Sequence, residues 1–312
     1  MAGAATAGIL EAIGNTPLVT LARLAPPGGA RVVVKLESTN PTGSMKDRVA
    51  RAMIERAVAD GRLSPGDTVV EYTAGTTGIS LALVCAALGF KAHFVFSDAF
   101  SEDKRRTMRA YGAEITDVPS ERGRITAELF KALIATAADL GRQPKHWQCD
   151  QLNNRDGEAG YYPLGEELWR QSGASVAAFV QSVGTAHSLH GTAHTLRRHN
   201  PQLRVVAVEP AESPVLSGGP SGAHNIDGIG VGFVPPLFRR AEVDEILTVS
   251  TADAKAMARR LAREEAIFAG TSTGANVAAA LRVAARLAPE VTVATIAVDS
   301  GLRYLSTDLY RN

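Results

Sequence analysis

The sequence predicts an α/β protein with two lobes, each a mostly parallel sheet flanked by helices. Three observations support this fold class. The chain has 312 residues, more than a single hydrophobic core usually supports. Short apolar segments typical of buried strands alternate with segments of helical periodicity. Glycine-rich turns join several of these strands to the helices that follow, as in parallel α/β sheets.

The first half of the chain repeats the strand–helix alternation. Apolar runs predict strands at 31–36, 68–71 and 93–96, and helical spacing predicts helices at 47–60, 79–88 and 102–111. These helices are followed by Gly61, Gly89 and Gly112, and glycine commonly terminates a helix. The alternation continues to about residue 148 and completes the first predicted lobe.

The second half predicts another α/β series. We expect helices at 165–171, 189–199, 252–265 and from 275 onward, and strands at 177–181, 205–209 and 291–298. A long glycine- and proline-rich segment at 210–239 interrupts this series. Loops of this length in compact proteins usually carry function.

The composition excludes several functional classes. Hydrophobic residues make up 45% and charged residues 21% of the chain, and the formal net charge is +1. We expect no nucleic-acid or membrane partner, because no basic run is interleaved with aromatics and the apolar runs are too short to span a bilayer. Residues 1–10 lack a basic segment, so we expect no signal peptide. Two cysteines, Cys85 and Cys149, exclude a disulfide framework and predict a cytoplasmic location.

Lys46 lies in the turn NPTGSMKDR at 40–48, between a predicted strand and a predicted helix. Pro41 and Gly43 interrupt the preceding apolar run, and Thr42 or Ser44 can cap the helix that follows. A lysine at such a junction can be aimed into a cleft. Taken alone, however, an ordinary surface lysine in a capped first turn is the more common case.

Three further glycine-rich turns each lead from an apolar strand into a helix, at 73–78, 184–188 and 270–274. Free backbone N–H groups and the helix dipole converge at a helix N-terminus, and glycine allows a phosphate or carboxylate to approach. One such turn is weak evidence. Three turns together with the lysine turn predict a cleft for a ligand with several negative charges.

The chain resembles the cysteine synthase and cystathionine β-synthase family of fold-type II pyridoxal-phosphate enzymes. The resemblance extends over nearly the whole chain, in the family's order. It is carried by IGNTPL (13–18), NPTGSMKDR (40–48), RAYGAE (109–114), VEP (208–210), SPVLSGG (213–219), HNIDGIGVGF (224–233) and DSGLRYLST (299–307). The implied fold is two-lobed and similar to the tryptophan synthase β subunit. Residues 1–45 and 149–312 would form a large cofactor-binding domain, and 46–148 a small mobile domain that binds the substrate carboxylate.

The resemblance also implies the cofactor, pyridoxal 5′-phosphate, and a role for each candidate residue. Lys46 would be the catalytic lysine that forms a Schiff base with the cofactor, which suits a lysine whose amine is made less basic by a partly apolar cleft. Ser272 would place a neutral hydroxyl at the pyridine nitrogen, which favours elimination over racemisation or transamination. The remaining cofactor-binding residues would be Thr76, Gly184, Thr185, Ala186, His187 and Ser188. Substrate would be bound by Thr73, Ala74, Gly75, Thr77, Gln151 and Gly228.

The active-site loops depart from the family pattern. The carboxylate loop usually reads Thr-Ser-Gly-Asn-Thr, whereas residues 73–77 read Thr-Ala-Gly-Thr-Thr. Thr76 replaces an amide that bonds the cofactor, a loss on the order of 1–3 kcal/mol if nothing compensates. The phosphate cup usually reads Gly-Thr-Gly-Gly-Thr, whereas 184–188 read Gly-Thr-Ala-His-Ser. Ala186 and His187 restrict the backbone, although the imidazole could contact the phosphate. Residues 154–160 also lack the usual proline–asparagine string. These departures predict altered substrate scope or, alternatively, lost catalysis.

Other chemical interpretations are weaker. His187, His190 and His194 suggest a metal, but no carboxylate or cysteine lies at ligand spacing, so we expect none. Asp47 and Glu71 could act as acid and base, but we expect both to serve structure.

We therefore expect a homodimeric enzyme that performs β-replacement on an O-activated serine (O-acetylserine or O-phosphoserine) through an aminoacrylate intermediate. The nucleophile would be sulfide by default, with an amine or another thiol as alternatives. Two other functions stay open. One is a β-eliminating lyase or dehydratase that releases pyruvate, and the other is a catalytically impaired homologue that binds a partner protein.

Overall fold

The computed structural model describes residues 8–123 and 126–311. Residues 1–7, on which the expectation of no signal peptide partly depends, lie outside the described residues. The chain divides into two compact units, here called unit 1 (residues 1–13 and 40–160) and unit 2 (residues 14–39 and 161–312). The predicted split of roles between 1–45 with 149–312 and 46–148 remains a prediction.

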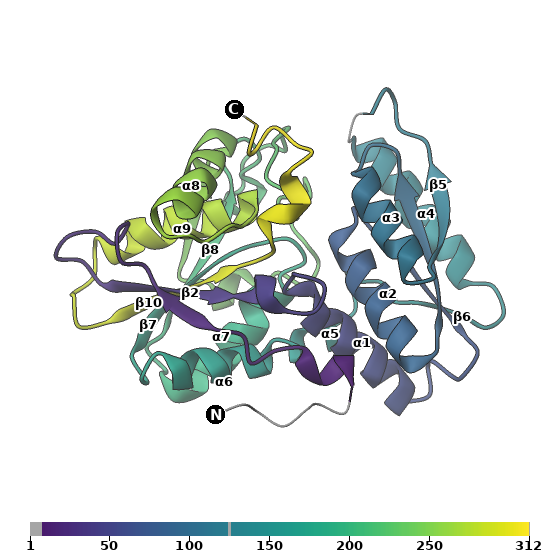
Figure 1. Ribbon diagram of the computed structural model, residues 1–312, viewed down its shortest axis with the longest axis horizontal. Coiled ribbons are helices and arrows are strands. Elements are labelled where there is room, and N and C mark those ends of the chain that lie inside the picture. The colour runs from purple at the N-terminus through teal and green to yellow at the C-terminus, as the bar shows by residue number, and fades with distance from the viewer. Residues whose placement is uncertain (1–7, 124–125, 312) are drawn as a thin grey trace. The chain divides into compact units, whose positions relative to one another are not determined.

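Unit 1 contains a four-stranded parallel sheet (Figure 1). Its strand order is β5 (Glu114–Val118), β4 (Lys91–Ser97), β3 (Thr68–Tyr72) and β6 (His146–Gln148). The helices α1 (Lys46–Ala59), α2 (Thr76–Leu88) and α3 (Glu102–Ala110) lie on one side, and α4 (Ala127–Gly141) covers the other. The short elements of the unit are α5 (Asp156–Ala159) and η1 (Ile9–Ala12).

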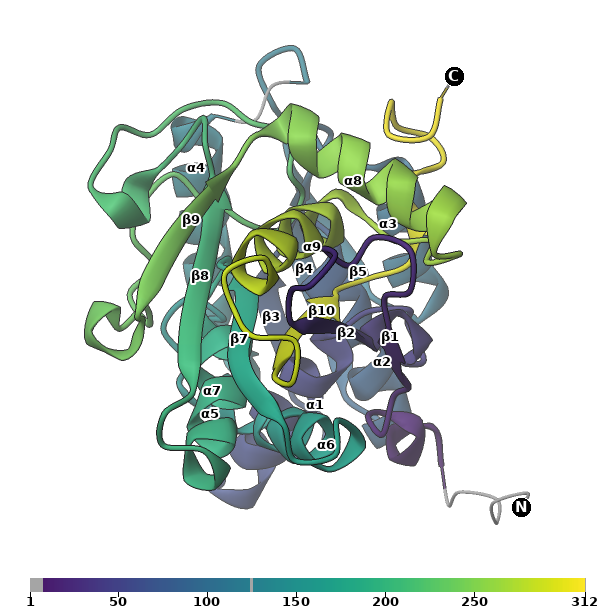
Figure 2. The same cartoon turned by 90° about the vertical axis from the view of Figure 1, so that its left-hand side faces the viewer.

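Unit 2 contains a six-stranded sheet. Its strand order is β1 (Leu18–Thr20), β2 (Arg31–Leu36), β10 (Thr292–Ala297), β7 (Val176–Ser182), β8 (Arg204–Pro210) and β9 (Glu245–Val249). Only β1 pairs antiparallel among these strands. Figure 2 shows β7, β8 and β9 side by side. The helices α8 (Thr251–Glu264) and α9 (Thr271–Ala284) lie on one side of the sheet, and α6 (Tyr162–Gln171) and α7 (His187–His199) on the other. Short 3₁₀ turns are η2 (Glu37–Thr39), η3 (Val215–Ser217), η4 (Arg240–Glu242) and η5 (Gly301–Tyr304).

The central strands are buried on both faces, as expected for a parallel sheet covered by helices. Every residue of β10 is buried, and β2 is buried from Val32 to Lys35. In α9, small buried residues such as Ala275, Ala279 and Ala280 bring the helix close to the sheet. This packing holds the carboxyl ends of the strands in place, and ligands of α/β proteins usually bind at these ends.

The predicted α/β fold class is confirmed, and most predicted elements are present within a few residues. The helices that follow the glycine-rich turns begin earlier than predicted, at Thr76, His187 and Thr271, so parts of these turns belong to first helical turns. Helix α6 also begins earlier, at Tyr162. Strands β1 and β9 were not predicted. Within the described residues, no helix is both long enough and apolar enough to span a membrane.

Candidate active site

Lys46 is the first residue of α1 and is half-buried. The turn before it is closed by the Gly43 N–H, which donates to the Asn40 carbonyl at 2.7 Å, and Gly43 has φ +78°. The Ser44 hydroxyl accepts the Lys46 N–H at 3.2 Å. Glycine is therefore needed to reverse the chain and deliver the lysine at the start of the helix.

Asp47, the next residue, ties the lysine turn to α2. Its carboxylate is buried and accepts the Thr42 N–H at 2.8 Å and the Thr42 hydroxyl at 2.5 Å. It also accepts the Ser80 hydroxyl at 2.6 Å. Thr42, which we expected as a possible cap, is used in this network. Ser80 lies one turn after Thr76, so Asp47 joins the lysine turn to the helix that begins at the predicted carboxylate loop.

The predicted carboxylate loop leads from β3 into α2. The Thr73 hydroxyl accepts the N–H groups of Gly75 and Gly78 at 2.9 and 3.1 Å, which closes the loop over the start of the helix. Gly75 has φ +123°, and a Cβ there would lie 2.4 Å from the Lys104 side chain. Ala74 is exposed and Thr76 is half-exposed. The first N–H groups of α2 have no partner within the helix, which makes this end suitable for a carboxylate.

Gln151 lies beside this loop. Its side-chain oxygen accepts the Thr77 hydroxyl at 2.9 Å, and its amide nitrogen donates to the Tyr72 carbonyl at 3.1 Å. Its backbone N–H donates to the Glu71 carboxylate at 2.9 Å. The structure therefore brings Thr73, Thr77 and Gln151 together at the carboxyl end of β3. Their binding of substrate stays a prediction.

The predicted phosphate cup in unit 2 joins β7 to α7. A Cβ at Gly184 would lie 2.4 Å from the Gly228 carbonyl oxygen, so the cup and the Gly228 loop touch through their backbones. Ala186 has φ +74° and precedes the helix. His187 is buried, with Nδ1 2.8 Å from the Thr185 hydroxyl. The Ser188 hydroxyl accepts from the Gln181 side chain at 3.2 Å.

The Gly228 loop is also bound to the start of α9. The Asp227 N–H donates to the Thr271 hydroxyl at 3.0 Å, and the Val298 N–H donates to the Thr273 hydroxyl at 2.9 Å. Ser272 lies between these two threonines and is 2% exposed. Unit 2 thus brings together three predicted regions: Gly184 before the start of α7, Ser272 at the start of α9, and the Gly228 loop that contacts both.

These residues fit a phosphorylated pyridine cofactor. The space beside Gly184 admits no side chain, and the start of α7 offers backbone N–H groups of the kind that bind phosphate. The neutral hydroxyl of Ser272 suits a ring nitrogen that is not held protonated. The lysine turn in unit 1 contains an amine of the kind that forms a Schiff base with an aldehyde, and this role of Lys46 stays a prediction.

Histidines outside the cup have structural partners. His190 Nε2 accepts the Arg239 N–H at 3.0 Å, and its Nδ1 lies 3.1 Å from the Glu242 carboxylate. His194 stacks on Tyr162 with ring centroids 4.8 Å apart. Among the described residues, no three His, Cys, Asp or Glu side chains are grouped so that they could hold a metal ion.

Two buried carboxylates contact predicted site residues, although the sequence suggested only structural roles for them. Asp47 holds the lysine turn, and Glu71 holds the Gln151 backbone. Burial raises the pKa of Glu71 to about 8, opposed by the hydrogen bond from Gln151 and reinforced by the negative charge of Asp150. The only sequence signals for these contacts were a charged residue at the end of an apolar strand, Glu71, and a charged residue directly after the lysine, Asp47.

A parallel α/β chain with a lysine at a helix start in one unit, and two helix starts suited to an anion in the other, has the features expected of an enzyme that uses a phosphorylated aldehyde cofactor. Comparison with known proteins agrees, because residues 9–299 match the family described as "Pyridoxal-phosphate dependent enzyme". The chain belongs to this family, which confirms the predicted cofactor and the predicted fold.

Individual relatives show which members of the family the chain is similar to. The chain is 42% identical over 304 residues to a cysteine synthase of Staphylococcus aureus, covering 97% of this chain and 96% of the relative. Its structure is similar to O-acetyl serine sulfhydrylase isoform 3 from Entamoeba histolytica, with a TM-score of 0.93, 37% identity and coverage of 99% and 92% of the two chains. It is also similar to O-ureido-L-serine synthase, with a TM-score of 0.92, 37% identity and coverage of 98% and 96%. The predicted resemblance to cysteine synthases is thereby confirmed.

Proposed function

We propose that the protein catalyses pyridoxal-phosphate-dependent β-replacement on an O-activated serine, with O-acetylserine as the first candidate substrate. The observation that carries this proposal is the Asp47 network, which joins Lys46 and the start of α2 within one unit. Chemistry at an α-carbon needs a base near the α-proton and an anchor for the α-carboxylate. Unit 1 supplies both from connected elements.

Each residue then has a defined task. Lys46 would hold the cofactor, and its amine would take the α-proton of the substrate. The bound cofactor supplies an electron-withdrawing ring that stabilises the negative charge left at the α-carbon. The substrate carboxylate binds at 73–77 with Gln151, and the cofactor phosphate binds at 184–188. Ser272 would offer its hydroxyl to the ring nitrogen, and the Gly228 loop would lie near the substrate amine.

The identity of the nucleophile is the part of the substrate specificity that two kinds of relative support differently. The names of the relatives support O-acetylserine as substrate and sulfide as nucleophile, as in cysteine synthase and O-acetyl serine sulfhydrylase. The similarity to O-ureido-L-serine synthase supports a different nucleophile equally well. Thr76 and His187, which replace the family's usual residues in the two loops, are consistent with this second choice.

The test is a visible-absorption titration of the purified holoenzyme with O-acetylserine, O-phosphoserine and serine. We expect O-acetylserine to shift the cofactor band, and added sulfide or an amine nucleophile to restore it while a new amino acid forms. The Lys46→Ala variant is the matched control and should give no turnover. No spectral change with any of the three substrates would refute the proposal. Pyruvate formed without a nucleophile would establish the β-eliminating lyase instead.

We also propose that the protein works as a homodimer in the cytoplasm. Cys85 and Cys149 are both free and buried, which suits a reducing compartment. Size-exclusion chromatography with light scattering tests the assembly, and a mass of about 33 kDa, that of one 32.8 kDa chain, would contradict it.

A further inference from the structure

Glu71 is a fully buried carboxylate at the carboxyl end of β3, with no exposed surface. Its two oxygens accept from different backbone groups. One accepts the Tyr72 N–H at 3.0 Å, and the other accepts the Gln151 N–H at 2.9 Å. The Gln151 contact spans 80 positions in the sequence, so Glu71 fixes the loop after β6 to the end of β3.

Gln151 passes this constraint to the carboxylate loop. Its side chain bonds both the Tyr72 carbonyl and the hydroxyl of Thr77, in the first turn of α2. A displacement of the Gln151 backbone would therefore disturb the Thr77 hydroxyl as well. Glu71 itself is covered by the protein and acts through Gln151.

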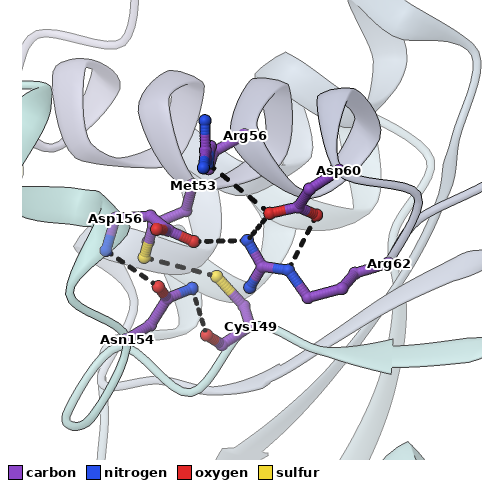
Figure 3. A network of polar contacts seen from close by, with 7 residues as sticks. All are labelled: Met53, Arg56, Asp60, Arg62, Cys149, Asn154 and Asp156. Atoms are coloured by element: carbon purple, nitrogen blue, oxygen red, sulfur yellow. Dashed lines mark hydrogen bonds and ion pairs between the residues drawn. The ribbon is translucent and has the colours of Figure 1, made fainter.

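Residues on both sides of Gln151 are held by polar contacts, and Figure 3 shows those of Cys149, Asn154 and Asp156. Cys149 Sγ contacts Met53 Sδ of α1 at 3.5 Å, and the Asn154 side chain donates to the Cys149 carbonyl at 3.0 Å. Asp156 pairs with Arg62 at 2.5 Å. With its flanks anchored in this way, the exact position of Gln151 depends on the acceptor that meets its N–H group.

Only an ionised carboxylate offers a free acceptor on each oxygen. A protonated carboxyl group and a glutamine side chain each have one acceptor oxygen and one donor, and the donor would oppose one of the two N–H groups. The Glu71→Gln variant is thus a close mimic of protonated Glu71, with the same size and shape.

We propose that Glu71 is a positioning residue, which in its ionised form aligns Gln151 and Thr77 for the substrate α-carboxylate. The inference rests on the proposed function, because it assigns the α-carboxylate to this loop. It goes further in predicting that substrate affinity depends on the protonation of a residue that never touches the substrate.

The surroundings of Glu71 bring its protonation into a pH range that experiments can cover. Burial raises its pKa to about 8, the Gln151 N–H opposes this rise, and the charge of Asp150 adds to it. Among the described residues, the negative charge of Glu71 also acts on Tyr72 of β3 and on Cys149 after β6, and burial raises the pKa of both. Both are therefore neutral while Glu71 titrates.

The experiment compares wild-type and Glu71→Gln holoenzymes at pH 6.5 and pH 9. It measures KM and kcat for O-acetylserine from initial rates, and the dissociation constant of L-alanine from the cofactor absorbance. We expect the ratio of the variant KM to the wild-type KM to be near 1 at pH 6.5. At pH 9 it should rise to roughly tenfold, the loss expected for one buried acceptor, with kcat changed less than threefold. Taking the ratio removes the titration of the substrate and of the cofactor.

Glu265→Gln is the matched control. Glu265 in unit 2 also accepts backbone N–H groups, from Ala22, Arg23 and Leu24, and belongs to no predicted site. Its KM should equal the wild-type value at both pH values. A ratio for Glu71→Gln that stays flat with pH, or a loss of kcat with unchanged KM, would overturn the proposal.

L-alanine separates this inference from the proposed function, because it has the α-carboxylate but no leaving group. Its dissociation constant should follow the same pH-dependent ratio even if O-acetylserine proves not to be a substrate. Equal L-alanine affinities of variant and wild type at pH 9 would refute the role of Glu71 whatever the reaction is.

Discussion

The Gly184→Ala substitution tests whether the backbone contact between Gly184 and Gly228 shapes the cofactor site. The added Cβ would lie 2.4 Å from the Gly228 carbonyl oxygen, whereas ordinary contacts begin near 3.4 Å. One of the two backbones must therefore move by about 1 Å. The Gly228 loop is held close by, since the Gly230 N–H donates to the Val183 carbonyl at 3.1 Å.

Overpacking of this kind costs about 1–3 kcal/mol. If the strain is relieved when the cup opens away from the phosphate, the same energy is lost from cofactor binding, which weakens it roughly 5- to 150-fold. The assay is titration of the cofactor-free protein with pyridoxal 5′-phosphate, followed by absorbance, together with the thermal midpoint. We expect weaker binding and only a small change in the midpoint of the cofactor-free protein.

Gly8→Ala is the control, because a Cβ at residue 8 meets nothing within 4 Å. It should bind the cofactor with wild-type affinity. Cofactor affinity of Gly184→Ala within twofold of the wild type would refute the argument that this contact shapes the cup.

Three further predictions concern unit 1. Ser80→Ala removes one donor to Asp47 and should lower kcat/KM for the proposed reaction about 3- to 10-fold, measured by initial rates, because the lysine turn loses its link to α2; unchanged rates would contradict this. Cys85 and Cys149 should react with a thiol reagent at pH 8 only after unfolding, since burial raises the pKa of Cys85 to about 12 and that of Cys149 well above its usual range; rapid labelling of the native protein would contradict this. The pKa of Glu71 is about 8 in the fold and about 4.5 when exposed, so the folded state binds one more proton than the unfolded state between pH 4.5 and pH 8. The stability that this proton contributes is lost as pH rises through this range. The free energy of unfolding, measured by urea unfolding at several pH values, should therefore fall as pH rises, by up to ~1.4 kcal/mol per pH unit. The fall should be steeper in the wild type than in Glu71→Gln, and the same pH dependence in both proteins would contradict this.

Local patterns predicted most of the fold, because the information lies within each element. The strand Arg31–Leu36 and the helix Lys46–Ala59 were predicted from apolar spacing and helix-ending signals. The starts of α2 and α7 were placed too late, because glycine-rich segments suggested turns. In the structure a single residue with positive φ, Gly75 or Ala186, makes each turn, and the helix begins immediately after it.

Strand β9 and the role of Glu71 depend on tertiary contacts and could not be predicted in this way. Glu245–Val249 has mostly half-buried residues and no clear alternation, and it is a strand because it pairs with β8. The hydrogen bond between the Glu71 carboxylate and the Gln151 N–H joins residues 80 positions apart, so it forms only once the fold brings them together. The lysine turn, by contrast, is a continuous segment, so its resemblance to the family motif was visible in the sequence, although Lys46 taken alone is more commonly a surface lysine.

The Asp47 network makes the lysine turn and the start of α2 a single mechanical piece. If unit 1 moves during the proposed reaction, the proposed base Lys46 and the proposed carboxylate loop move together, and the distance between them stays the same. The geometry at the α-carbon is then independent of how the rest of the pocket changes. Substitutions outside this network can therefore change the leaving group or the nucleophile of the proposed reaction without changing the arrangement needed for proton transfer. This independence favours the evolution of new reactions on the same fold.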